Sequence, residues 1–359
     1  MRTALARCAE TPEAIVLFDS TIPEPTELLA GVIGRAFSDK VTDRYESVFA
    51  SGNRFVAQAV AKRAGVSPDQ VIGAAGATSA MAMAIRAFVQ PGERVLVETP
   101  GFDLLATLAR EAGAVVDLLP RWAPHFSVDP AELEVAIRPD TRLILLTQLH
   151  NPTGAALSRQ ALDDIAQVAR KRSVKVLIDA VYADFLGEAG AVPPHPEFIV
   201  AGSLSKVHGL FALRCGWLTA SGEDIARIEA ANPQGDLAVS KLTHAIGALV
   251  LEDLEPFDAH WRACLGATRS AVEPHIRAMI QEGLLDGALP QAGCMYFPRV
   301  VGVEDTLALS EALWAQDRLI VAPGEHFGLA GHIRIGLGGE PDLLERGLIR
   351  LANALRRET

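Results

Sequence analysis

The chain has few of the features that mark several large classes of protein. Its four cysteines form no C-x-x-C pair, which argues against a zinc knuckle or a thioredoxin-like motif, and we expect no metal site. Lysine and arginine (33) are outnumbered by aspartate and glutamate (44), so the net charge is −11. Nucleic-acid binders normally carry a basic patch, and anionic membranes attract basic segments, so we expect neither partner.

Long apolar runs are also missing. No run approaches the ~20 residues that a membrane-spanning helix requires. The first ten residues, MRTALARCAE, lack a sustained apolar stretch, and we therefore expect no signal peptide. Four cysteines in a chain of this length are ordinary for a reducing compartment. Together these observations predict a cytoplasmic protein.

What is present is the composition of a folded protein, with 49% apolar and 21% charged residues. From about residue 70 to 220, short strand-like runs alternate with helical patterns. The strands are predicted at 94–98, 114–119, 143–147, 175–179 and 198–201, and the helices near 78–89, 103–112, 131–137 and 158–172. Several strands are continuous apolar runs, the pattern of strands buried on both faces. We therefore predict an α/β fold with a mainly parallel sheet sandwiched by helices.

The pattern changes after the first two thirds of the chain. The elements predicted there are a long helical stretch over 222–283, strands at 295–301 and 332–337, and a helix at 342–357. We predict a large domain over 35–235, and a linking helix with a smaller α+β domain over 236–359. Residues 1–34 contain several prolines and little periodicity, which favours an arm that contributes to the small domain.

In open α/β sheets, ligands bind at the carboxyl ends of the strands. Small residues at Gly73–Ala80 end one strand and open a helix there. Free N–H groups at a helix N-terminus suit a phosphate-sized anion, although a tightly packed turn explains the segment as well. The segment is neither a P-loop nor a G-x-G-x-x-G motif, so nucleotide binding is not supported.

Two further clusters follow neighbouring strands. His150–Gly154 (HNPTG) comes after the 143–147 strand, where a buried asparagine would need a polar partner, although a simple turn is the alternative. Asp179 closes the next apolar strand, where a carboxylate is costly unless a cation or donor meets it. Tyr182 can offer a hydroxyl to the same pocket. A helix N-cap explains Asp179 equally well.

The fourth cluster places Ser203, Ser205, Lys206 and Arg214 among apolar residues. A solvated surface position is the usual one for a lone lysine. A desolvated lysine, in contrast, has a lowered pKa and can form a Schiff base. Pyridoxal phosphate requires such a lysine, a carboxylate facing its ring nitrogen, donors to its phenolic oxygen and a phosphate cup. The clusters together supply these groups.

The motifs GAT, P-x-F, HNPTG, D-x-x-Y, S-x-S-K with an arginine eight residues on, and R-I-G occur in this order between about residue 45 and residue 338. This combination resembles the class I/II aminotransferases, which are fold-type I pyridoxal-phosphate enzymes. The resemblance implies transfer of the amino group of an L-amino acid to a 2-oxo acid. An amino-acid decarboxylase, a β/γ-lyase or a cyclising synthase on the same scaffold is the alternative.

The resemblance also implies roles for single residues. Lys206, Asp179 and Tyr182 are the implied catalytic residues: the Schiff-base lysine, the partner of the ring nitrogen, and a donor to the phenolic oxygen. Asn151 is the second donor, and Phe102 stacks on the ring. The implied phosphate cup consists of Gly76, Ala77, Thr78, Ser203, Ser205 and Arg214.

Arg334, in R-I-G, is implied to bind the substrate carboxylate beside Asn151, because a guanidinium can pair with a carboxylate through two hydrogen bonds. The family resemblance further implies a homodimer with active sites near the interface, where Tyr45 reaches the phosphate of the neighbouring subunit. Glu325 and His326 fill a P-G-x-x-F-G loop in an unusual way, with substrate contact as one explanation.

The N-terminal segment Phe18–Pro23 lacks the Asn-Glu-Asn-Pro-like run of some family branches. Because this segment often lines the substrate pocket in the family, the amino acid and the oxo acid stay open. A ligand sensor fused to a DNA-binding module is disfavoured, since few residues precede the resemblance and the net charge is acidic.

Overall fold

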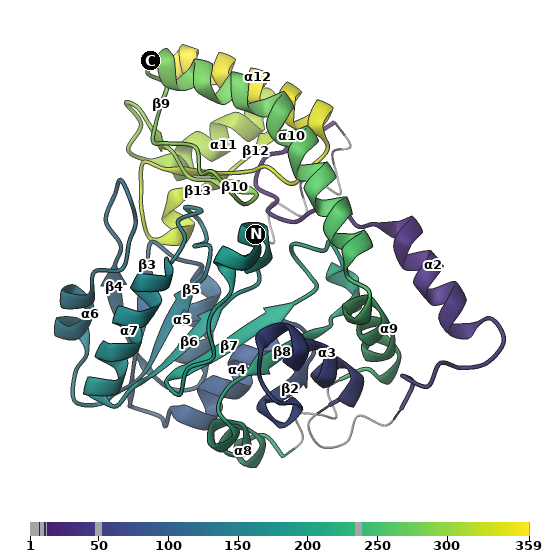
Figure 1. Cartoon of the computed structure of the whole chain (residues 1–359). Helices are drawn as coiled ribbons and strands as arrows, with labels where there is room; N and C mark the ends of the chain where they lie inside the picture. The colour runs from purple at the N-terminus through teal and green to yellow at the C-terminus, as the bar shows by residue number, and fades with distance from the viewer. Residues whose placement is uncertain (1–6, 8–10, 12, 47–51, 234–238, 359) are drawn as a thin grey trace.

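The computed structural model describes residues 7, 11, 13–46, 52–233 and 239–358 (Figure 1). Its centre is a seven-stranded sheet in the order β2-β8-β7-β6-β5-β3-β4. All neighbouring pairs from β7 to β4 are parallel, and β8 runs antiparallel to both of its neighbours. The predicted mainly parallel α/β fold is confirmed. The strands are β2 (Val71–Ala74), β3 (Arg94–Thr99), β4 (Val115–Pro120), β5 (Thr141–Thr147), β6 (Lys175–Asp179), β7 (Phe198–Ser203) and β8 (Gly216–Thr219).

The central strands are buried on both faces because alternate side chains point to opposite sides of the sheet. Leu145 and Leu177 enter one apolar core, and Ile144 and Val176 enter another. The first core is covered by α4 (Ala77–Phe88), α5 (Asp103–Glu111) and α8 (Gly222–Ala231). The second is covered by α6 (Pro130–Ala136) and α7 (Arg159–Arg172). Helices therefore pack on both faces of the sheet, as the continuous apolar strands predict.

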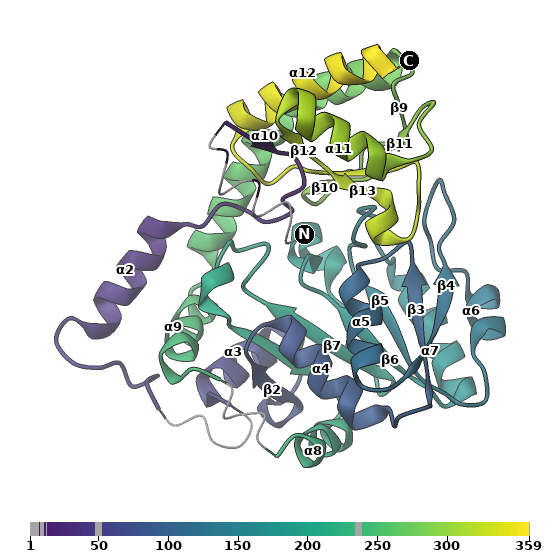
Figure 2. The same ribbon diagram turned by 180° about the vertical axis from the view of Figure 1, so that it is seen from behind.

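In the described part of the predicted long helical stretch after residue 222, the structure has three helices. Helix α8 is followed by α9 (Lys241–Glu252) and by α10 (Glu255–Gln281), which has 27 residues. Helix α10 runs from the level of the sheet to a second layer, drawn at the top of Figures 1 and 2, where it packs along α12 (Pro341–Glu358).

The second layer contains short strands and two helices. Its three-stranded sheet has the order β10-β14-β13, and β9 pairs with β11. Helix α12 and α11 (Thr306–Asp317) pack against each other and beside these strands. The strands are β9 (Leu285–Asp286), β10 (Met295–Tyr296), β11 (Arg299–Val300), β13 (Ala322–Pro323) and β14 (Ile333–Gly336).

The N-terminal segment reaches the same layer. Strand β1 (Ile15–Val16) pairs in parallel with β12 (Leu319–Ile320). Helix α2 (Thr26–Phe37), which is not among the predicted elements, extends away from the rest of the chain in both views (Figures 1 and 2). Helix α3 (Arg54–Ala64) follows and packs on α9.

The predicted domain limits stay predictions. The limit between residues 34 and 35 falls inside helix α2. The limit between residues 235 and 236, and most of the first ten residues, lie outside the described part of the chain. Within the described part, no helix combines the length and apolar character needed to cross a membrane.

A fully buried ion pair joins strands β3, β4 and β5 at their carboxyl ends. The Nη1 atom of Arg121 donates to Glu98 Oε2 at 2.7 Å, and both side chains have 0% exposure. Thr147 donates its hydroxyl to the other oxygen of Glu98, and Arg121 Nε donates to the carbonyl of Phe126. Burial raises the pKa of Glu98, and the Arg121 charge opposes this rise.

We predict that Arg121→Met destabilises the protein by about 3–5 kcal/mol, because the substitution leaves the buried Glu98 carboxylate without its cation. Because the folded protein raises the pKa of Glu98 above its ordinary value, the free energy of unfolding of the wild type should fall as pH rises from about 4.5. Urea unfolding at several pH values will measure both effects. The double variant Glu98→Gln/Arg121→Met should be more stable than Arg121→Met and should lose the pH dependence that Glu98 causes. Equal stability of Arg121→Met and the wild type would contradict the prediction.

Candidate functional site

The predicted catalytic side chains lie at one edge of the sheet. Asp179 is the last residue of β6, Asn151 lies four residues after β5, and Lys206 lies three residues after β7. Because these neighbouring strands are parallel, their carboxyl ends meet at the same edge. Asp179 and Asn151 are buried, and Lys206 is half-buried.

Asp179 is held inside the protein by few donors. Its Oδ1 accepts a hydrogen bond from the N–H of Val181 at 3.2 Å, and only 6% of the residue is exposed. Burial raises the pKa of Asp179 to about 6, and the Lys206 charge opposes this rise. The nearest helical segment begins at Ala183 with Tyr182 as its N-cap, so Asp179 is not the helix N-cap that the sequence also permits.

Lys206 and Tyr182 meet hydroxyls from the N-terminal segment. The Lys206 amine donates to Thr21 Oγ1 at 3.3 Å, and the Tyr182 hydroxyl lies 2.8 Å from Ser20 Oγ. Burial raises the pKa of Tyr182. Ser20 and Thr21 are not among the predicted site residues. The one sequence signal for them is their place in Phe18–Pro23, the segment expected to line the substrate pocket.

The predicted phosphate cup forms around the N-terminus of α4. Gly76 is the N-cap, with a φ of +84°, so that the first N–H groups of the helix, from Ala77 and Thr78, lack intrahelical acceptors. Arg214 Nη2 donates to the carbonyl of Ala75 at 3.3 Å. A Cβ atom on Gly76 would overlap the Arg214 guanidinium, so only glycine lets the cation lie against this turn.

Two serines belong to the predicted cup. Ser203 Oγ accepts a hydrogen bond from the N–H of Ser205 at 3.3 Å. The hydroxyl of Ser205 is buried and has no partner in the described part of the chain. A buried polar group normally has a hydrogen-bond partner, so this hydroxyl fits an external acceptor such as a phosphate oxygen.

Arg334 is a buried cation without a carboxylate partner in the described part of the chain. It is 4% exposed, and its Nη atoms donate to Asn151 Oδ1 and to the carbonyl of Phe18, both at 2.8 Å. Its Nε has no partner, and its guanidinium lies 4.9 Å from the ring centre of Phe327. A buried charge with only neutral partners favours an anionic ligand.

The predicted ring-stacking residue, Phe102, lies on a loop that contacts the other parts of the site. Gly101 donates its N–H to the carbonyl of Phe327 at 2.9 Å. His150 Nε2 lies 2.8 Å from the carbonyl of Pro100, and its Nδ1 lies 2.7 Å from Thr153 Oγ1. Burial lowers the pKa of His150, so the neutral ring donates from Nε2 and accepts at Nδ1.

Three other predicted residues have different surroundings. Tyr45 is 40% exposed, and its ring packs against Phe37 and the Lys241 ammonium. Its contact with a neighbouring subunit stays a prediction. Glu325 accepts hydrogen bonds from the N–H and the hydroxyl of Thr306, the first residue of α11. Glu325 therefore holds the start of this helix, which explains the unusual loop, and the adjacent His326 is exposed.

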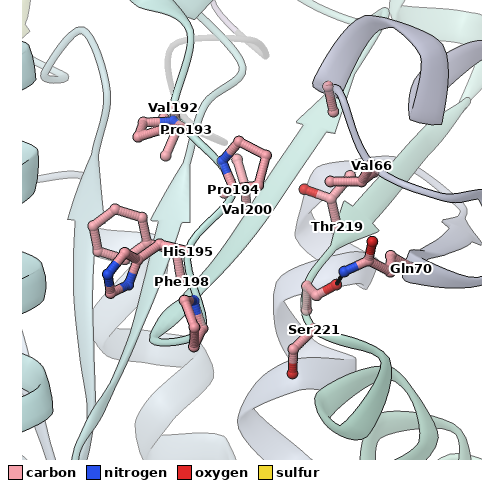
Figure 3. A pocket seen from close by; sticks show the side chains of 13 residues that line it. Val66, Gln70, Val192, Pro193, Pro194, His195, Phe198, Val200, Thr219 and Ser221 are labelled. Carbon is pink, nitrogen blue, oxygen red and sulfur yellow. Dashed lines mark hydrogen bonds between the residues drawn. The ribbon is translucent and has the colours of Figure 1, made fainter.

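A pocket of about 200 Å³ lies elsewhere (Figure 3). It is bordered by the start of β7, the end of β8 and the loop with Pro193, Pro194 and His195. These strand ends are opposite to the edge that carries Asp179 and Lys206. The pocket contains none of the predicted site residues. Among the residues that the structure describes, no group of histidines, cysteines and carboxylates could hold a metal ion.

The chain belongs to the class I and II aminotransferases, whose family model matches residues 45–351. It is 28% identical over 318 residues to capreomycidine synthase of Streptomyces vinaceus, covering 85% of this chain and 79% of that protein. It is 27% identical to an arginine–pyruvate transaminase of Pseudomonas aeruginosa, covering 94% and 89%. An aspartate aminotransferase double mutant of Thermus thermophilus has the same fold, with a TM-score of 0.87, 21% identity and coverage of 98% and 94%.

As a member of this family, the chain is a pyridoxal-phosphate-dependent enzyme. The residues present fit this cofactor. The groups that would hold the phosphate are the turn at Gly76, the Arg214 guanidinium beside it, and the Ser205 hydroxyl, which has no partner among the described residues. The buried Asp179 fits a protonated ring nitrogen, because a cation beside it would offset the cost of its burial.

We predict that Gly76→Ala weakens the affinity for pyridoxal phosphate by at least about tenfold, because the added Cβ displaces the Arg214 guanidinium. Gly65→Ala is the matched control: Gly65 also has a positive φ, +68°, but a Cβ there meets nothing within 4 Å. Absorbance titration of both variants will measure the affinity. Equal binding by Gly76→Ala and wild type would refute the predicted phosphate cup.

We also predict that the affinity for pyridoxal phosphate falls by up to about tenfold per unit as pH drops below about 6, where Asp179 takes up a proton. The second ionisation of a phosphate lies near the same pH, so Asp179→Asn serves as the control. This variant should bind more weakly with a shallower pH dependence. Identical pH profiles for both proteins would exclude the Asp179 carboxylate as the titrating group.

Proposed function

We propose that this enzyme is an aminotransferase that moves the amino group of an L-amino acid to a 2-oxo acid. The observation that carries the proposal is the meeting of an amine, a buried carboxylate, a buried phenol and a buried guanidinium at one edge of the sheet. These groups belong to Lys206, Asp179, Tyr182 and Arg334. When bound, pyridoxal phosphate supplies an electron-accepting ring that stabilises negative charge at the substrate Cα.

The chain's own groups have distinct tasks in this proposal. Lys206 attaches the cofactor covalently, and its free Nζ moves a proton at the substrate Cα. Asp179, when ionised, holds a proton on the ring nitrogen. Tyr182 and Asn151 donate to the phenolic oxygen. The geometry of Asn151 supports this task, since its Oδ1 already accepts from Arg334 and its Nδ2 is the group left to donate.

Arg334 orients the substrate. Its Nε is unpartnered, and each Nη uses one hydrogen in the contacts with Asn151 and Phe18, which leaves donors for a carboxylate. Fixing the carboxylate decides which bond of the Cα lies perpendicular to the ring plane, and so which bond breaks. Phe102 covers the ring, and Gly76–Thr78, Ser203, Ser205 and Arg214 bind the phosphate.

The assembly and the location are part of the proposal. We propose a homodimer with active sites near the interface, supported by helix α2, which extends from the body with Ile33 39% exposed, and by the exposed Tyr45 (Figure 1). A cytoplasmic location is supported by Cys215 and Cys294, which are buried and unpaired. A division of the chain near 34/35 and 235/236 is also proposed, supported by the two layers that α10 connects; its first limit belongs at an end of α2, since residues 34 and 35 lie within that helix.

A cyclising synthase is a second candidate. The observation in its favour is the 28% identity to capreomycidine synthase over 85% of this chain. Such an enzyme would use the same Lys206, Asp179 and Arg214. The two candidates differ in their product, since an aminotransferase releases a 2-oxo acid and leaves the amino group on the cofactor.

The test is to add L-amino acids one at a time to the loaded protein, without an oxo acid, and to record its visible spectrum and products. Arginine, the donor named in one relative, belongs in the panel. We expect one amino acid to convert the cofactor to its amine form with release of the matching 2-oxo acid. Cyclic product without oxo acid would favour the synthase. In Lys206→Ala we expect no borohydride-stable cofactor adduct; an adduct there would overturn the lysine assignment.

A further inference from the structure

The N-terminal segment Leu17–Pro23, here called the strap, passes through the site and contacts it at successive positions. Its backbone accepts from the second layer: Leu17 O from the N–H of Gly336 at 2.6 Å, and Phe18 O from Arg334. Its side chains Ser20 and Thr21 then reach Tyr182 and Lys206. The N–H of Ile22 donates to the carbonyl of Lys206 at 3.2 Å.

The strap is fixed by close backbone contacts on both sides. A Cβ atom on Gly336 would overlap the backbone of Asp19, and a Cβ on Gly209 would lie 2.7 Å from the carbonyl oxygen of Pro23. Glycine at both positions therefore lets the strap lie directly against β14 and against the loop after Lys206. Strand β1, just before the strap, is paired with β12. The hydroxyls of Ser20 and Thr21 are thus positioned by a backbone segment that is held along its length.

Ser20 and Tyr182 are joined by a hydrogen bond in which either hydroxyl can be the donor. Ser20 is 4% exposed, and its Oγ lies 2.8 Å from the Tyr182 hydroxyl. A phenol has one hydrogen to donate. When Ser20 donates to the Tyr182 oxygen, that one hydrogen is free to point at the phenolic oxygen of the cofactor. The same hydrogen bond lowers the pKa of Tyr182 against the rise that burial causes.

Thr21 holds the Lys206 amine. Among the described residues, its Oγ1 is the one hydrogen-bond partner of Lys206 Nζ, at 3.3 Å. The Phe211 ring, with its centre 5.9 Å from Nζ, is the other neighbour that a cation would prefer. A neutral amine that donates an N–H to Thr21 keeps its lone pair free to accept a proton. The hydroxyl therefore fixes the amine without consuming the group that does the chemistry.

We propose that Ser20 and Thr21 are positioning residues for the reaction, with Ser20 orienting the Tyr182 phenol and Thr21 orienting the Lys206 amine. The inference rests on the proposed roles of Lys206 and Tyr182. It assigns to the strap two side chains that the family resemblance does not provide, because the Asn-Glu-Asn-Pro-like run of some family branches is replaced here by Ser-Thr-Ile-Pro.

The first test uses the cofactor-free protein. Competitive acetylation followed by mass spectrometry will give the rate at which Lys206 reacts at a fixed pH. In Thr21→Val we expect faster acetylation, because the amine is no longer held against its acceptor, whereas Thr21→Ser should retain the wild-type rate. Thr26→Val is the matched control, since Thr26 is an exposed threonine five residues further along the chain. Equal rates in Thr21→Val and wild type would overturn the role of Thr21.

The second test uses the loaded enzyme with its best amino acid. Thr21→Val should lower kcat by about tenfold or more with little change in KM, because the misplaced group acts on the chemical step. Ser20→Ala should raise the pH midpoint of the cofactor's visible absorbance change, because Tyr182 donates less to the phenolic oxygen. An unchanged midpoint in Ser20→Ala would overturn the role of Ser20.

The outcomes separate this inference from the proposed function. A covalent cofactor adduct that persists in Lys206→Ala would remove the basis of both. Normal attachment at Lys206, together with wild-type kcat and acetylation rate in Thr21→Val, would refute the positioning role alone. Circular dichroism and thermal unfolding of each variant will show whether it folds, and Thr21→Ser, which keeps the hydroxyl, provides the rescue.

Discussion

The burial of one guanidinium, that of Arg334, is the constraint on which the site depends. A permanent charge that is buried away from water requires hydrogen-bond partners. Arg334 donates to the side chain of Asn151, after β5, and to the carbonyl of Phe18. These two contacts bind the central sheet, the strap and the second layer to one another at the same point. Because both partners are neutral, the charge stays available to an anion. The same interaction thus joins the parts of the fold and leaves a positive charge at the edge of the sheet where we propose that the substrate binds.

The remaining chemistry follows from the direction of the strands. Parallel strands β5, β6 and β7 end at one edge, where Asn151, Asp179 and Lys206 come within reach of each other although they are far apart in the sequence. Burial then sets their properties, raising the pKa of Asp179 and of Tyr182. At the opposite edge of the sheet the loops carry prolines and a small pocket, and the buried Asp224 is paired there with Lys175.

The large sheet and most of the site could be predicted because their signals are local. Apolar runs such as 143–147 and 175–179 are long enough to identify buried strands, and the polar residues Asn151 and Asp179, just after the first run and at the end of the second, point to the site. Helix α2 could not be predicted, since residues 1–34 show little periodicity and only Val32 and Ala36 of the helix are buried. The contact of Glu325 with the start of α11 could not be predicted either, because only folding brings its partner Thr306 near. Ser20 and Thr21 belong to no motif, so their contacts with Tyr182 and Lys206 could not be predicted before the position of the strap was known.

The pairing of β1 with β12 has a consequence for the order of folding. Residues 15 and 16 are made on the ribosome long before their partners at 319 and 320. Local strand–helix units can form as the chain emerges, whereas this contact must wait until residues 319 and 320 have been made. During synthesis, residues 15 and 16 therefore have no strand partner until β12 has been made. The strap that follows β1 is held along its length only after that point, so Ser20 and Thr21 are among the last side chains to be fixed beside Tyr182 and Lys206.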